Sequence, residues 1–261
     1  MPRSPAPKDR HPKLRRADGR RALVIGGSGE IGSAIARMLA AEGADVAIHY
    51  HERRTEAEKV AGDVRRLGRR TAVVQAALES SKSVYLMRDQ LHESFGTIDT
   101  LVNCAGINRD CLFAKMNDDL WAEVIQVNLF GTYHCSRAFV EEIVASGRGR
   151  IINISSVAGH MGNEGQVNCA ASKRGVIGFT MSLARELARV GTTVNVVAPG
   201  FIATSVLDTI TDDVKQKALS QIPMNRFGTP REVALGVIHL VSDASDYVTG
   251  SVLNLNGGMY L

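Results

Sequence analysis

Short apolar segments alternate with longer segments of helical periodicity along most of this 261-residue chain. The short segments are apolar at consecutive positions rather than at every second one, which is typical of strands buried on both faces. Such strands form parallel sheets, because the connecting helices pack on the two faces. The sequence therefore predicts an α/β fold with a single doubly wound parallel sheet, helices on both faces, and a ligand beyond the carboxyl ends of the strands. The expected strands cover residues 22–25, 46–49, 71–75, 98–103, 151–154, 194–198 and 252–255.

The connecting segments predict helices, and some of their ends carry clear signals. Thr55-Glu56-Ala57-Glu58 is interpreted as a capping box that opens a helix, and Gly68 ends that helix. Residues 201–222 have a looser pattern and are expected to form a mobile helical flap. The other long helices are expected over about residues 81–95, 118–145, 168–190 and 230–241.

The start of the chain differs from the rest in charge and in apolar content. Residues 1–21 hold eight Lys or Arg and two Asp, a net charge of +6, so the +4 of the whole chain leaves −2 for the other 240 residues. Four prolines and almost no apolar residues prevent this segment from forming a packed helix. We expect a flexible basic tail over residues 1–20 and one folded domain over 21–261. The alternatives for the tail are weak contact with nucleic acid or an anionic surface, or an organelle-targeting role.

Compartment and metal content can also be predicted. No apolar leader opens the chain and it has no run of about 18 apolar residues, so we expect a cytoplasmic protein without a membrane segment. The 240 residues after the basic segment have a net charge of −2 and give no reason to expect a nucleic-acid partner. The cysteines form no C-x-x-C pair and have no neighbouring His cluster, so we expect reduced thiols and no metal site.

A glycine-rich turn follows the first expected strand. The sequence Gly26-Gly27-Ser28-Gly29-Glu30-Ile31-Gly32 stands between a strand and a helix, where backbone N–H groups and the positive end of the helix dipole can bind a pyrophosphate. Gly26, Ser28, Glu30, Ile31 and Gly32 are therefore candidate cofactor-binding residues. Glu30 either repels the phosphates or points to solvent in the first helical turn, where its charge favours the dipole.

The end of the second strand is where a dinucleotide ribose is recognised. An acid at this place holds the 2′-hydroxyl of NAD, whereas arginine accommodates the 2′-phosphate of NADP. Tyr50 occupies the position of the acid, and Arg53 and Arg54 follow it, so NADP is the expected cofactor. The alternative is that both arginines are surface charges of the next helix.

The segment from Asn153 to Lys173 carries the candidate chemistry. Together with the glycine turn, it resembles the short-chain dehydrogenase/reductase superfamily, in which a Ser is followed thirteen residues later by Tyr-x-x-x-Lys. Ser156 and Lys173 keep this spacing, but Cys169 stands in the tyrosine position. The resemblance covers nearly all of residues 20–261 and implies a Rossmann-type fold.

The resemblance implies a role for each matching residue. In this superfamily the tyrosine donates a proton to the substrate carbonyl as hydride arrives, and the lysine lowers the pKa of the tyrosine and holds the nicotinamide ribose. The serine hydrogen-bonds the carbonyl, and an asparagine completes a proton relay. The matching catalytic set is Asn128, Ser156 and Lys173, with Cys169 in the donor's place. Implied cofactor contacts are Asn103, Ala105, Gly106, Lys173, Pro199, Gly200, Ile202 and Thr204, whereas Ile25, Glu30 and Ala77 depart from the family pattern.

Cys169 leaves three interpretations open. A thiol one helical turn before a lysine can have a depressed pKa, but it is too short to reach the carbonyl, so a water would bridge the gap in an impaired reductase. The chain could instead be a subunit that keeps the fold after losing catalysis. The third interpretation is a nucleophilic thiol, although no His and acid accompany it, since His160 is near only in sequence.

Further segments narrow the resemblance to the β-ketoacyl-[acyl carrier protein] reductases of fatty-acid and polyketide synthesis. They are Met161-Gly162-Asn163, Gly165-Gln166 and residues 199–204, 247–250 and 256–260. This resemblance implies NADPH-dependent reduction of a 3-oxoacyl thioester, a tetramer formed through residues 118–145 and 168–190, and acyl carrier protein as partner. Arg148, Arg150 and Arg174 are candidates for meeting the acidic carrier. The alternative is a noncatalytic subunit in a hetero-oligomer with an active, tyrosine-containing homologue.

Overall fold

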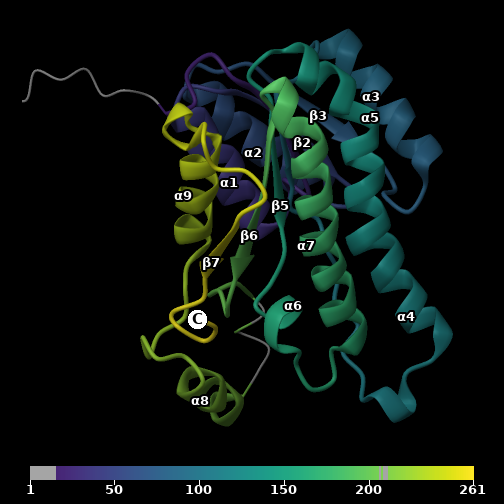
Figure 1. Ribbon diagram of the computed structural model, residues 1–261, viewed down its shortest axis with the longest axis vertical. Coiled ribbons are helices and arrows are strands. Elements are labelled where there is room, and N and C mark those ends of the chain that lie inside the picture. The colour runs from purple at the N-terminus through teal and green to yellow at the C-terminus, as the bar shows by residue number, and fades with distance from the viewer. Residues whose placement is uncertain (1–15, 206, 208–210) are drawn as a thin grey trace, which may run out of the picture.

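Seven parallel strands form one sheet in the part of the chain that this computed structural model describes, residues 16–205, 207 and 211–261. Figure 1 shows this sheet between helices on both sides. The strand order is β3-β2-β1-β4-β5-β6-β7, so the chain winds outward from β1 in one direction and from β4 in the other. This reversal is the switch point of a doubly wound sheet, and it confirms the predicted Rossmann-type fold. The strands are β1 (Arg21–Ile25), β2 (Asp45–Tyr50), β3 (Thr71–Gln75), β4 (Thr100–Asn103), β5 (Arg150–Ile154), β6 (Thr193–Pro199) and β7 (Val252–Leu255).

Helices cover both faces of the sheet. The elements α1, α2 and α9 contribute to the core on one face, and α3, α5 and α7 contribute to the core on the other. In the ranges described, no helix combines the length and the apolar character needed to cross a membrane. The helices are α1 (Glu30–Ala41), α2 (Arg54–Arg66), α3 (Ser81–Ser94), α4 (Asp118–Ile125), α5 (Gly131–Ala145), α6 (Ala158–Met161), α7 (Val167–Leu187), α8 (Asp212–Ser220) and α9 (Pro230–Val241).

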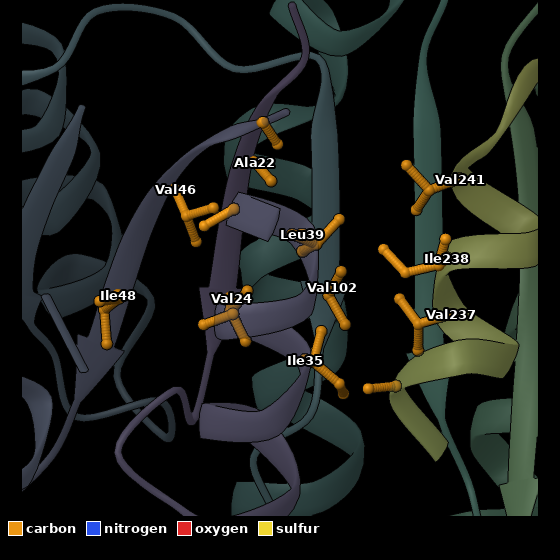
Figure 2. Close-up of a cluster of buried hydrophobic side chains, with 14 of the residues drawn as sticks. Ala22, Val24, Ile35, Leu39, Val46, Ile48, Val102, Val237, Ile238 and Val241 are labelled. Atoms are coloured by element: carbon orange, nitrogen blue, oxygen red, sulfur yellow. The ribbon is translucent and has the colours of Figure 1, made fainter. Parts of the chain in front are cut away.

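Consecutive residues of β1 enter opposite cores. Ala22 and Val24 pack with the face of α1 and α9, where Figure 2 shows their side chains with those of both helices. Leu23 and Ile25 pack into the second core with α3 and α5. Because side chains alternate along a strand, burial of both faces requires the uninterrupted apolar run that the sequence shows.

Two predicted helices differ from the structure in their details. The helix α2 begins at Arg54, and its N-cap, Arg53, makes no side-chain capping bond, so the capping box expected at Thr55 is wrong. The expected helix over 118–145 is interrupted by a π-helical turn at Gln126–Phe130, which separates α4 from α5. Such turns insert one extra residue and often occur at functional sites, because they redirect a side chain. Of the expected flap over 201–222, α8 is helical, and residues 206 and 208–210 lie outside the described ranges.

Residues 16–20, expected to belong to the tail, pack on the domain. Ala17 is buried, and its N–H donates to the carbonyl of Glu42. The Arg20 side chain is 2% exposed and donates to the carbonyl of Arg148 and the carboxylate of Asp243. The boundary at residue 20 is therefore corrected, because a buried, paired arginine belongs to the folded unit. Residues 1–15, the rest of the expected tail, lie outside the described residues.

Candidate active site

One large cleft lies beyond the carboxyl ends of the strands, at the switch point between β1 and β4. Its volume is about 1330 Å³, and its walls come from the β1–α1 turn, the end of β2, the loop after β4, α7 and the segment after β6. The structure thus brings most predicted site residues into one cavity. Those that line it are Gly26, Ser28, Glu30, Ile31, Gly32, Arg53, Ala105, Gly106, Ser156, Cys169, Lys173, Pro199, Gly200, Ile202 and Thr204.

The glycine turn after β1 packs directly against the loop after β4. Gly26 has a φ of 75°, and a Cβ atom there would lie 2.8 Å from the backbone nitrogen of Ala105. A Cβ atom on Gly32 would lie 2.2 Å from the Gly26 carbonyl oxygen, so α1 can begin this close to the turn only with glycine. The first turn of α1 lines the cleft and presents N–H groups that have no partner within the helix. These residues fit the pyrophosphate of a dinucleotide cofactor.

Arg53 is the arginine that faces the cofactor end of the cleft. A Cβ atom on Gly29 would lie 3.5 Å from its Nη2 atom, so the guanidinium lies against the glycine turn. Arg54 instead extends toward Glu58, 4.0 Å away, and its side chain is 73% exposed. Tyr50 is buried in the core beside α2. The prediction is corrected for Tyr50 and Arg54, because successive residues at a helix start point about 100° apart and only Arg53 turns inward.

Lys173 extends from α7 to the centre of the cleft. Its Nζ atom donates to the carbonyl of Ile154 at 2.9 Å, at the end of β5. Burial lowers the pKa of this ammonium, against the opposing effect of the thiols of Cys169 and Cys104. A Cβ atom on Gly106 would lie 3.2 Å from Nζ, so the small residue keeps the lysine accessible from the loop after β4.

Asn128 lies in the π-helical turn and is fully buried behind the cleft. Its Oδ1 atom accepts from the N–H of Ile107 at 2.8 Å, and its Nδ2 atom donates to the carbonyl of Ile107 and to Ser172 Oγ. The side chain therefore holds the loop after β4 in position next to Lys173. The π-helical turn places the amide at this depth, which an uninterrupted helix over these residues would not do.

The two serines after β5 have different environments. Ser156 lines the cleft, and its Oγ atom accepts from the N–H of Ala158 at 3.1 Å, which leaves the hydroxyl hydrogen to donate. Ser155 is buried and donates to the carbonyl of Lys173 at 2.9 Å. Ser155 therefore ties β5 to α7, and Ser156 is the hydroxyl available to a ligand.

Cys169 is 4% exposed and lies four residues before Lys173 in α7. Its Sγ atom donates to Asn108 Oδ1 at 3.4 Å. Burial raises the pKa of this thiol, with Asp110 adding to the rise and Lys173 opposing it. The depressed pKa expected from the neighbouring lysine is wrong, because removing the thiolate from water outweighs the attraction of the ammonium. Cys169 is therefore a neutral thiol.

Comparison with known proteins agrees with this geometry. Residues 27–260 match the sequence profile of the family described as enoyl-(acyl carrier protein) reductase. The chain belongs to the short-chain dehydrogenase/reductase superfamily. The glycine turn, the π-helical turn, Ser156 and Lys173 lie together at the cleft of this superfamily member.

Three relatives cover nearly the full domain. This short-chain dehydrogenase/reductase is 43% identical to the 3-oxoacyl-[acyl-carrier-protein] reductase FabG of Staphylococcus aureus (strain Mu50) over 240 residues, which are 92% of this chain and 98% of the relative. It is 43% identical to FabG of Haemophilus influenzae over 93% of this chain and 99% of the relative. It is 44% identical to nodulation protein G of Rhizobium meliloti over 92% and 97%, respectively.

Asn103 has a different place from the one predicted. Its Nδ2 atom donates to Asn153 Oδ1 at 2.8 Å and to Ser136 Oγ at 3.2 Å, and Asn153 donates in turn to Thr180. All four polar side chains are buried between the sheet and the helices α5 and α7. Asn103 therefore holds these layers of the short-chain dehydrogenase/reductase fold together and does not line the cleft.

Arg148 and Arg150 lie at the opposite edge of the sheet from the cleft. Arg150 is the first residue of β5, and its side chain pairs with Asp246. Arg148 pairs with Asp99 at 2.8 Å. Both arginines stabilise the amino ends of the strands. The prediction that they contact a carrier at the cleft is therefore corrected. Arg174, exposed on α7 next to Lys173, keeps that possibility.

Among the residues that the structure describes, the other reactive side chains do not form a second catalytic set. The His160 ring stacks on Tyr260 with 4.4 Å between ring centroids, and the partner of the Cys169 thiol is an amide rather than a His. All four cysteines are free. In the described ranges, no three His, Cys, Asp or Glu side chains come together in a way that could hold a metal ion.

Sequence reasoning missed several residues of the cleft, among them His49 and Asn108. His49, at the end of β2, accepts from the N–H of Gly26 at 3.0 Å through Nδ1, and its Nε2 atom lies 3.1 Å from the carbonyl of Ala76. His49 therefore connects the glycine turn to the ends of β2 and β3. Asn108, in the loop after β4, contacts Cys169. The available signal was position alone, since both follow or end strands at the carboxyl edge of the sheet.

Proposed function

We propose that this chain is an NADPH-dependent oxidoreductase that reduces a 3-oxoacyl thioester, carried by acyl carrier protein, to the 3-hydroxyacyl form in fatty-acid or polyketide synthesis. The observation that carries the proposal is the joint placement of the glycine turn, Ser156 and Lys173 in one cleft, in a chain more than 40% identical to two reductases named for this substrate. Free thiols suit a reducing compartment, so we place the activity in the cytoplasm.

The cofactor lies along the switch point in this proposal. The first turn of α1 binds the pyrophosphate, Arg53 binds the 2′-phosphate, and Lys173 hydrogen-bonds the nicotinamide ribose. The bound reduced nicotinamide supplies a hydride to the substrate carbon. The buried ammonium of Lys173 also attracts the negative charge that develops on the substrate oxygen, since the surrounding protein screens charge less than water does.

The substrate end of the cleft is formed by the loop after β4, α8 and the segment before α7. Val214 and Ala218 of α8 supply apolar surface, while Asp110, Asn163 and Gln166 supply polar groups. Gln166 donates to Asp110 at 2.9 Å, which holds the two segments together across the mouth of the cleft. This mixture suits an acyl chain attached to a polar thioester arm. Arg174, exposed on α7 directly after Lys173, is our candidate contact for the acidic carrier.

Turnover is slow in this proposal because Cys169 cannot act as the family's tyrosine does. Its thiol is neutral, short and already directed at Asn108. A positioned general acid typically contributes 10²–10⁴-fold to a rate, and that contribution is missing here.

The presence of Cys169 in place of a tyrosine also supports a second candidate function, a noncatalytic subunit that assembles with a tyrosine-containing homologue. Large apolar side chains remain exposed on α4, α5 and α7 and the turn between α4 and α5, and such a surface is typical of an oligomer interface. They are Trp121, Phe130, Tyr133, Val167 and Met181. A homotetramer and a hetero-oligomer would both use this surface.

The deciding experiment is NADPH oxidation by the purified chain with a short 3-oxoacyl thioester. The variant Cys169→Tyr is expected to be about 10²–10⁴-fold faster than the wild type, because the phenol reaches toward Ser156 and Lys173 lowers its pKa. Cys169→Ser is the matched control, since its hydroxyl is as short as the thiol and no gain is expected. Failure of wild type and Cys169→Tyr alike, with NADPH bound, would overturn the reductase proposal and favour the subunit.

A further inference from the structure

Asn108 and Cys169 are 61 residues apart in sequence and are brought into contact in the cleft. The Cys169 sulfur occupies the place where a tyrosine ring at this position would begin, because Sγ follows Cβ as the first ring carbon would. The Asn108 amide lies directly against that sulfur, 3.4 Å away. The amide therefore lies beside the start of the space that a tyrosine side chain at this position would fill.

The contact orients the amide. A neutral thiol donates its hydrogen, and the group that accepts it is the Oδ1 oxygen of Asn108. The Nδ2 atom is bonded to the same carbon and carries two hydrogens, which the contact with the thiol leaves available to donate. Within the described ranges, no protein group accepts a hydrogen bond from Nδ2, and Asn108 is exposed to the cleft.

We propose that the side-chain amide of Asn108 is a catalytic hydrogen-bond donor that, together with the Ser156 hydroxyl, stabilises the negative charge on the substrate oxygen where the family uses a tyrosine. This inference rests on the proposed function. Asparagine amides serve as oxyanion donors in other enzymes, and removing one such donor costs about 10²–10³-fold in rate. Cys169 is then a positioning residue, which acts by holding Oδ1.

The step balances without an acidic side chain at position 169. The substrate C3 atom gains the hydride that the reduced dinucleotide supplies, and the π electron pair of its C=O bond moves to oxygen. Asn108 and Ser156 donate hydrogen bonds to that oxygen, which then takes a proton from solvent to become the 3-hydroxyl group. The keto group is reduced, the dinucleotide is oxidised, and the amide keeps its protons.

The test is a set of double-mutant cycles on reductase turnover, with NADPH affinity measured for every variant. Asn108→Ala removes the donor, and Asn108→Asp removes the donor but keeps an acceptor for the Cys169 thiol. Both are expected to lower the turnover of the wild type by about 10²-fold or more. In the Cys169→Tyr background the phenol stabilises the substrate oxygen in place of the amide. The fold-loss of turnover from Asn108→Ala should then be less than a tenth of its value in the wild type. Asn163→Ala, which removes another amide lining the cleft, is the control and should have the same effect in both backgrounds.

The outcomes separate this inference from the proposed function. Equal losses from Asn108→Ala in both backgrounds, or full activity of Asn108→Asp, would overturn the donor role and leave the substrate assignment intact. An inactive wild type beside an active Cys169→Tyr would also overturn the donor role, because the amide would then not replace the phenol. If neither form reduces the thioester while NADPH binds, the proposed function fails together with the inference.

Discussion

The carboxylate of Glu30, the first residue of α1, accepts three hydrogen bonds from Ser205. The Ser205 N–H lies 2.9 and 3.1 Å from the two carboxylate oxygens, and its hydroxyl lies 2.6 Å from one of them. Glu30 is therefore neither a free solvent-facing charge nor a group pointing at the phosphates alone. It ties the segment after β6 to the turn where a pyrophosphate would bind.

Neutralising Glu30 is expected to improve NADPH binding. Glu30→Gln keeps an acceptor for Ser205 but removes a negative charge beside the glycine turn. We expect a two- to fivefold gain in affinity, which corresponds to an exposed charge interaction of about 0.5–1 kcal/mol. Calorimetric titration measures it, with Ser205→Ala as the control that leaves the charge in place. Unchanged affinity in Glu30→Gln would mean that the carboxylate acts only on the loop.

The two neighbouring arginines are expected to differ in cofactor selection. Arg53→Ala should lower the affinity for NADPH about 10–100-fold relative to NADH, because hydrogen bonds to a charged group contribute about 1.5–3 kcal/mol. Arg54→Ala should leave the ratio of NADPH affinity to NADH affinity unchanged, since this side chain points to Glu58 on the outer surface. Titration of each variant with both dinucleotides tests the pair. Equal effects of the two substitutions would contradict the inward placement of Arg53.

Two truncations are expected to separate the basic segment from the domain. A chain that starts at Arg16 should melt as the full chain does. A chain that starts at Arg21 should melt about 4–8 °C lower, because losing the buried Arg20 contacts costs about 2 kcal/mol. Thermal unfolding of both truncations shows the difference. Identical melting would restore the boundary predicted from composition.

His49 is expected to make stability depend on pH. Burial lowers its pKa from 6.5 to about 4. Between pH 6.5 and 4, His49 is therefore protonated in the unfolded chain and neutral in the folded chain. The contribution is fully present above about pH 6.5 and is lost as pH falls toward 4, by about 3 kcal/mol in all. Urea unfolding at pH 7.5, 6 and 5 measures this loss. His49→Gln should flatten the dependence, whereas His51→Gln, at an exposed position, should retain it.

Local chemistry explains why much of the fold was predictable. Apolar residues at consecutive positions of β1 require burial on both faces, and Pro230 starts α9 where the sequence placed it. Ser156 and Lys173 could be assigned to one site because their spacing resembles the pattern of the short-chain dehydrogenase/reductase superfamily. The glycine turn was predictable because only glycine permits the backbone geometry at Gly26 and Gly32.

By itself, the sequence determined the strands, the helices and the glycine turn, because their preferences act over a few neighbouring residues. Its resemblance to a known family indicated most of the residues expected at the cleft. Only the tertiary structure decided that Arg53 faces inward, that Asn103 joins the layers, and that burial outweighs Lys173 in setting the pKa of Cys169. The same holds for the contact between Asn108 and Cys169. Desolvation and pairing depend on groups that folding brings together from distant segments, so no local pattern encodes them.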